Sequence, residues 1–86
     1  MPEISRFYGI IIRMFYNDHN PPHFHAIYQE DEALIEIKTL EILGGHLPKR
    51  AMSLAVEWAI EHREELLRNW NKARNNETLD RIEPLD

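Results

Sequence analysis

The sequence predicts an α+β domain, with an antiparallel sheet of three to five strands over about residues 3–43 and one long or two shorter helices over about residues 48–75. Two observations predict it. The first half alternates apolar and polar residues between turn-forming residues, which is typical of antiparallel strands. The second half has no glycine or proline between residues 49 and 76, and its apolar residues recur at helical spacing. The 86 residues are expected to form a single domain, residues 1–86.

The first two strands are expected at residues 4–8 and 10–16, with Gly9 as the bend between them. Side chains alternate between the two faces of a strand, so the second strand presents one set inward and another set outward. The inward set is Ile10, Ile12, Met14 and Tyr16. The outward set is Ile11, Arg13 and Phe15.

The third strand is expected at residues 23–28, followed by a polar turn at residues 29–32 and a fourth strand at residues 33–38. Leu40 and Ile42 either continue the fourth strand or form a short fifth one. Consecutive short strands with tight connections predict an antiparallel meander.

A broad apolar stripe runs along residues 49–76, opposite a charged face, and predicts an amphipathic helix packed on the sheet. The stripe consists of Ala51, Ala55, Trp58, Ala59, His62, Leu66, Trp70 and Ala73. A continuous helix of this length would span about 42 Å, longer than a domain of this size. We therefore expect either an overhanging helix or a break near residues 61–63. The remaining segment, residues 76–86, is expected to be an extended tail that either frays or docks through its apolar side chains.

The most unusual segment is residues 17–25, Asn-Asp-His-Asn-Pro-Pro-His-Phe-His, which holds three of the five histidines. In a strand, His23 and His25 point to the same face, about 7 Å apart along the chain. Asp18 and His19, across the proline turn, would supply further ligands. The candidate metal ligands are therefore Asp18, His19, His23 and His25. The ion would be divalent, such as zinc, nickel or manganese, and Asp18 is the candidate catalytic residue, as ligand or general base.

Three other interpretations of this segment stay open at this point. It is also compatible with a stiff hydrogen-bonded turn in which the histidines bind backbone groups or stack on aromatic rings. Polar or catalytic use without a metal is a second possibility. The third is a pH-responsive site, because clustered histidines titrate near pH 6–7.

Composition excludes several classes of function. The chain has no cysteine, which rules out disulfides and thiolate sites and is compatible with the reducing cytoplasm. The absence of a signal-peptide pattern and of a long apolar segment leads us to expect a cytoplasmic protein that does not bind membranes. With a formal net charge of −5 the chain is expected to bind nucleic acids poorly without sequence specificity, because that affinity comes mainly from neutralising phosphates.

The outward sheet face is expected to be half apolar, which suggests that a protein partner or a second copy of the chain covers part of it. The candidate partner-binding residues are Ile11, Arg13, Phe15 and Ile27. The tail or a helix could cover this face instead, and a shift of one residue in the assignment would invert it.

The chain resembles the domain of unknown function 4160 family of small bacterial proteins. The resemblance rests on residues 15–25, on Gly45-His46-Leu47-Pro48, on Trp58, on residues 62–67 with Trp70, and on residues 81–85. It implies a small cytosolic protein with no established activity. Some family members are encoded beside a second small protein, and a toxin–antitoxin-type role has been suggested for such pairs.

Two functional hypotheses follow. The first is a protein-interaction module, acting as a homo-oligomer or as one component of a toxin–antitoxin-like two-protein system. The second is a metal-dependent hydrolase or nuclease that uses Asp18, His19, His23 and His25.

Overall fold

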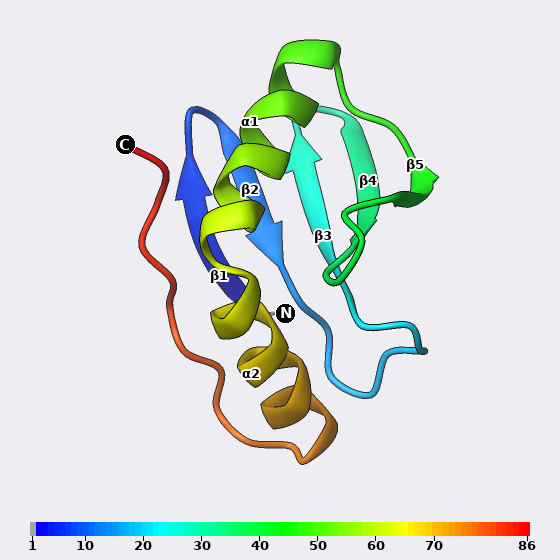
Figure 1. Ribbon diagram of the computed structural model, residues 1–86, viewed down its shortest axis with the longest axis vertical. Helices are drawn as coiled ribbons and strands as arrows, with labels where there is room; N and C mark the ends of the chain where they lie inside the picture. The colour runs from blue at the N-terminus through cyan, green and yellow to red at the C-terminus, as the bar shows by residue number, and fades with distance from the viewer. Residues whose placement is uncertain (1) are drawn as a thin grey trace.

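The computed structural model describes residues 2–86 and shows a sheet followed by two helices (Figure 1). The elements in chain order are β1 (Glu3–Phe7), β2 (Ile10–Arg13), β3 (His23–Tyr28), β4 (Asp31–Glu36), β5 (Ile42–Gly45), α1 (Lys49–Glu61) and α2 (Arg63–Arg74). The five strands lie side by side in sequence order, and every neighbouring pair is antiparallel. The predicted α+β class and the predicted meander are therefore confirmed.

The turns of the two hairpins differ in length from those that the sequence predicted. The β1–β2 turn consists of Tyr8 and Gly9, both with positive φ, which matches the twist of the flanking strands. The β3–β4 turn is shorter than the predicted residues 29–32, because Asp31 already pairs with Tyr28 in the sheet. β4 consequently begins at Asp31 and ends at Glu36, two residues before the predicted end.

The predicted second strand was too long. Its pairing ends at Arg13, Met14 bonds the carbonyl of Pro2, and Asn17 adopts a left-handed backbone that turns the chain away. Tyr16 is therefore 39% exposed instead of facing the core. At the other end of the sheet, the fifth strand is present and reaches Gly45, beyond residue 43.

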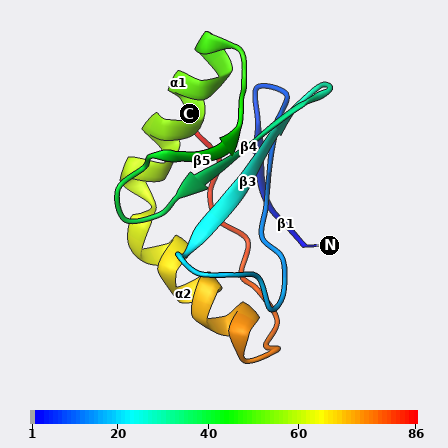
Figure 2. The same cartoon turned by 90° about the vertical axis from the view of Figure 1, so that its right-hand side faces the viewer.

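Both helices cover the same face of the sheet, and the opposite face carries no helix (Figure 2). The core lies between these layers. Trp58 is fully buried at its centre, with its ring 5.4 Å from that of Phe7 and 5.9 Å from that of Phe24, measured between centroids. The inward strand residues are Ile10, Ile12, Phe24, Ala26, Ala33 and Ile35, and all of them are buried.

The helical half breaks at His62, within the predicted interval. His62 leaves helical geometry, with φ −125° and ψ 23°, and its ring bonds Glu65 in the first turn of α2. Arg63 donates to the backbone carbonyl of Ile37 and ties the junction to the end of β4. The bend keeps both helices on a molecule whose longest dimension is 33 Å. Within residues 2–86, no helix has the length and apolar character needed to cross a bilayer.

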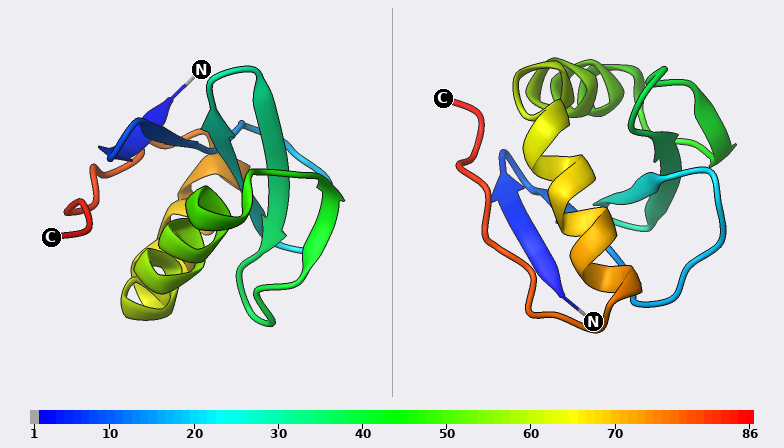
Figure 3. Two further views of the ribbon diagram at one scale, coloured as in Figure 1. Left: turned by 90° about the horizontal axis from the view of Figure 1, so that it is seen from above. Right: turned by 60° about the horizontal axis from the view of Figure 1, so that its bottom comes forward.

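The tail docks along β1 instead of fraying, as the right view of Figure 3 shows. The backbone N–H of Ile82 donates to the carbonyl of Ile4 at 2.8 Å, and the indole N–H of Trp58 donates to the carbonyl of Glu83 at 2.8 Å. The buried Asn69 side chain bonds both the N–H and the C=O of Asp80, each at 2.9 Å. The tail thus covers the β1 edge of the sheet.

Candidate metal centre

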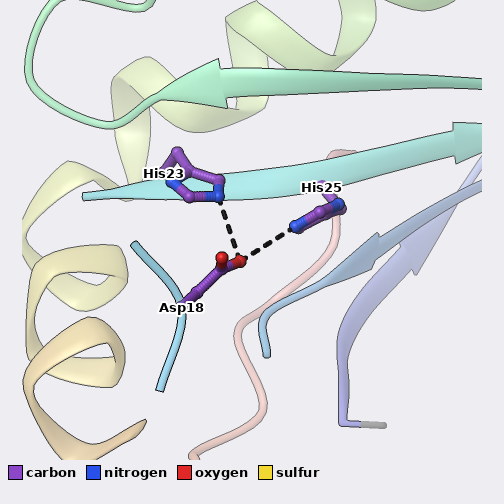
Figure 4. A group of neighbouring side chains, drawn as sticks. All are labelled: Asp18, His23 and His25. Atoms are coloured by element: carbon purple, nitrogen blue, oxygen red, sulfur yellow. Dashed lines mark hydrogen bonds and ion pairs between the residues drawn. The ribbon is translucent and has the colours of Figure 1, made fainter. Parts of the chain in front are cut away.

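Three side chains from the predicted segment meet at one point, where the loop after β2 faces the start of β3 (Figure 4). Asp18 Oδ2 lies 3.1 Å from His23 Nε2 and 3.2 Å from His25 Nε2. All three potential ligand atoms lie within 4.8 Å of one another.

Three hydrogen bonds hold the loop that carries Asp18. Asp18 Oδ1 accepts the backbone N–H of His19 at 2.9 Å, so one carboxylate oxygen is fixed and the other faces the histidines. Arg74 of α2 donates to the Asn20 side chain at 3.0 Å. The carbonyl of Pro22 accepts the backbone N–H of Ile37 at 3.0 Å, which anchors the loop to the chain after β4.

His23 is held on its far side by the backbone. Its Nδ1 lies 2.8 Å from the carbonyl oxygen of Pro21. A carbonyl only accepts, so Nδ1 must carry the proton and donate it. The ring is 5% exposed and packs against the ring of Trp70, with centroids 5.3 Å apart. The ring is therefore fixed, and its Nε2 is directed toward Asp18.

His25 is held in the same way by a carboxylate. Its Nδ1 lies 2.8 Å from Glu32 Oε2, across the β3–β4 pair. An ionised carboxylate only accepts, so this Nδ1 also carries a proton. The ring of Phe15 meets the ring of His25 edge-on, with centroids 4.3 Å apart and an interplanar angle of 75°.

The Asp18 carboxylate is ionised at neutral pH. Partial burial alone raises its pKa, but the backbone N–H of His19, the hydrogen bond with His25 and the electrostatic effect of His23 and His25 outweigh burial. The net effect lowers the pKa of Asp18 below its ordinary value of 3.8. The centre therefore has an anionic oxygen at the point where both Nε2 atoms converge.

This donor set fits a divalent metal ion. Two imidazole nitrogens and one carboxylate oxygen form a common catalytic ligand set for zinc and for non-haem iron. With bonds of about 2.0–2.2 Å, two ligand atoms of a tetrahedral site lie roughly 3.3–3.6 Å apart. The two nitrogen–oxygen distances, 3.1 and 3.2 Å, come close to this range, and all three ligand atoms lie within 4.8 Å of one another. The outer nitrogens also donate to a carbonyl and to a carboxylate, the arrangement that orients metal-binding histidines in proteins.

The structure does not bring the fourth predicted ligand to this point. The side chain of His19 is exposed and is not part of the cluster. Only its backbone N–H contacts Asp18, to which it donates a hydrogen bond. His62 lies at the helix junction beside Trp58 and bonds Glu65. His46 is exposed and lies 3.4 Å from Asp31.

The four residues predicted to bind a partner are all half-buried on the sheet face away from the helices. Ile11 lies directly opposite Ile27, and Arg13 lies directly opposite His25. Phe15 contacts the His25 ring. These residues therefore share a face with the histidine cluster and border it.

Glu32 is the residue of the site that the sequence analysis missed, because it was assigned to the turn. The sequence nevertheless contains a pattern that places Glu32 in the strand. Glu32, Leu34 and Glu36 alternate with the inward Ala33, Ile35 and Ile37. Extending this alternation back by one step places Glu32 in the strand, on the outward face that also carries His25.

Fold and site together define a class of small α+β proteins, in which a five-stranded meander backed by two helices holds an Asp-His-His cluster at one end of the sheet. The chain belongs to the family described as domain of unknown function (DUF4160), which matches residues 9–71. The predicted family is confirmed. No curated protein and no solved structure matches the chain.

Proposed function

We propose that Asp18, His23 and His25 bind one divalent metal ion and that this centre catalyses hydrolysis. One observation carries the proposal: both Nε2 atoms converge on a single carboxylate oxygen while both Nδ1 atoms are committed to acceptors. A ring that donates from Nδ1 can direct the lone pair of its Nε2 toward Asp18. A cation bound at this point would accept both Nε2 lone pairs and the carboxylate oxygen.

The number of ligands favours a catalytic centre over a structural one. Structural zinc sites use four protein ligands, whereas catalytic sites use three and keep a position for water or substrate. The cluster offers three ligands and borders the helix-free face of the sheet. A bound metal of this kind supplies a water molecule whose pKa is lowered toward neutrality.

The geometry gives each residue a role. His23, fixed by Pro21 and Trp70, is the rigid buried ligand. His25 is the ligand whose orientation depends on Glu32. Asp18 acts as a ligand and not as the general base, because Oδ1 is engaged by His19 and Oδ2 faces both imidazoles.

The test is the metal content of protein purified without a histidine tag. We expect stoichiometric zinc, iron, nickel or manganese in the wild type and its loss in the His23→Ala/His25→Ala variant. The matched control is His19→Ala/His46→Ala, which removes two exposed histidines outside the cluster and should keep the metal. A wild type that takes up none of these ions after incubation would remove the proposal. Hydrolase assays on the loaded protein follow.

A second candidate, a protein-interaction module, is favoured by the open β5 edge. This edge strand exposes Ile42 by 51% and Leu43 by 41%, and unpaired strands readily add a strand from another chain. The partner would be a second copy or the neighbouring protein of a cytoplasmic toxin–antitoxin-type pair, as the family resemblance suggests. The molar mass in solution, alone and with that neighbour, tests it, and Ile42→Asp/Leu43→Asp should abolish any complex.

A further inference from the structure

We propose that Arg13 is the anion-binding residue of this centre and that the centre therefore acts on small phosphate esters. The inference rests on the proposed metal site and names its substrate class. It comes from the position of Arg13, from the absence of a partner for it, and from the groups around it.

Arg13 lies directly opposite His25 in the β2–β3 pair. Residues opposite each other in an antiparallel pair share a face, with Cβ atoms about 4.5–5.5 Å apart. The burial pattern confirms that Arg13 lies on the face away from the helices, since Ile10 and Ile12 are buried while Ile11 and Arg13 are half-exposed. The Arg13 side chain therefore begins beside a metal ligand, within reach of a group bound at the centre.

Within residues 2–86, Arg13 forms no ion pair and no side-chain hydrogen bond. The nearby carboxylates are committed elsewhere. Glu3, its other cross-strand neighbour, bonds Arg6 at 2.7 Å and Arg81 at 3.3 Å. Asp18 faces the two histidines, and Glu32 holds His25. The side chain of the half-buried Arg13, which starts beside His25, is thus left with all its donors available within the described residues.

A phosphoryl group suits this combination best. The planar guanidinium fork matches two oxygens of one phosphate, and a metal ion beside it neutralises a third. The same two groups stabilise the charge that spreads over phosphoryl oxygens in the transition state. Ile11, Phe15 and Ile27 border the position and offer contact to the organic part of an ester.

The net charge limits the size of the substrate. A formal charge of −5 gives a long polyanion little favourable electrostatic energy. A small phosphate monoester needs only the local cations. In its hydrolysis the oxygen of water bonds to phosphorus, and the ester P–O bond breaks with its electrons going to the leaving oxygen. That oxygen takes one proton of the water, and the other proton stays on the released phosphate.

The experiment uses cobalt-loaded protein and inorganic phosphate as the probe. Cobalt(II) reports its coordination in the visible spectrum, so phosphate bound at the centre changes that spectrum. We expect Arg13→Gln to weaken phosphate binding by about tenfold or more while cobalt affinity stays unchanged, because charge-assisted hydrogen bonds are lost. The phosphate affinity of Arg13→Lys should lie between those of the wild type and Arg13→Gln, since lysine keeps the charge but lacks the guanidinium fork. Arg50→Gln, exposed at the start of α1, is the matched control and should bind phosphate normally.

Each contrary outcome has a distinct meaning. If cobalt does not bind the wild type, the proposed function fails and this inference fails with it. If cobalt binds but phosphate leaves the spectrum unchanged, or acetate acts equally well, the metal site stands and the phosphate-ester assignment is wrong. If Arg13→Gln binds phosphate like the wild type, Arg13 has no such role. Should Arg13→Gln fail to fold, Arg13→Lys and Arg50→Gln make the comparison.

Discussion

Glu32 acts on the centre only through the ring of His25. Its carboxylate accepts the Nδ1–H of His25 at 2.8 Å and is otherwise about half exposed. We expect Glu32→Ala to weaken metal affinity by roughly 10–100-fold, because outer partners of metal-binding histidines fix ring orientation and basicity. Competition with a chromophoric chelator measures this change. Glu30→Ala, in the adjacent turn, is the control, and an unchanged affinity in Glu32→Ala would show that His25 needs no such support.

The two neighbouring glycines of β5 are expected to differ in how far an alanine substitution destabilises the fold. Gly45 has a φ of +69°, and a Cβ there would collide with the backbone carbonyl of Glu32. A Cβ on Gly44 would meet nothing within 4 Å. We expect Gly45→Ala to lower the free energy of unfolding by about 1–2 kcal/mol or more, and Gly44→Ala to change it by less than about 0.5 kcal/mol. Urea unfolding checks both, and equal values for the two variants would contradict the assigned backbone.

Residue identity and alternation predicted part of the centre. His23 and His25 had to share a face once they lay in one strand, and Asp18 was named beside them. The direction of His19 could not be predicted, because it depends on loop geometry set by distant anchors such as Arg74 and Ile37. Glu32 was missed because its assignment depended on the length of one turn.

Among the elements, α2 holds the tail through Asn69. The Asn69 side chain bonds both the N–H and the C=O of Asp80, the same two backbone groups that a neighbouring strand would bond. Asn69→Ala removes both bonds and leaves the Asp80 N–H and C=O without this partner. We expect a loss of about 1–3 kcal/mol in the free energy of unfolding and faster proteolysis after residue 76. Asn71→Ala, exposed on the same helix, should do neither. A tail equally resistant in both variants would mean that its other contacts, such as those of Ile82, Trp58 and Arg81, hold it without Asn69.

Whether a segment forms a strand or a helix was predictable, because the spacing of its apolar residues is a local property. The residues at which the strands begin and end were not predictable from that spacing. The break at His62 followed from comparing helix length with domain size. The extra strand residues of β4 and β5 are fixed by pairing with neighbours, as in Asp31 opposite Tyr28 and Ile42 opposite Ile35. The docking of the tail required contacts with β1 and α2, which no local pattern contains.

At the scale of the whole molecule, Glu3 joins the two ends of the described chain, because it bonds Arg6 in its own strand and Arg81 in the tail. The bond from Arg6 lowers the pKa of Glu3 below its ordinary value of 4.5; slight burial opposes this, and Arg81 adds to it. A lowered folded-state pKa means that the stabilisation is complete above about pH 4.5 and is lost as pH falls through the lower folded value.

Glu3→Gln should therefore lower the thermal unfolding temperature near pH 6–7 and make progressively less difference toward pH 3. A pH series of thermal unfolding curves for the two proteins measures this, and added salt should shrink the difference at neutral pH because the ion pairs are exposed. Glu77→Gln, exposed in the segment after α2, is the control. A gap between wild type and Glu3→Gln that persists at pH 3 would show that the carboxylate charge is not its cause.

Because the tail lies along the β1 edge, β5 is the one open edge of the sheet within the described residues 2–86. A sheet with two open edges can add copies at both ends and grow into a fibre. A molecule with one open edge can join only one other copy through it. Two copies joined there, related by a two-fold axis, leave no edge for a third, so edge-to-edge assembly stops at the dimer. We therefore expect the docked tail to prevent edge-to-edge growth on the β1 side of the sheet.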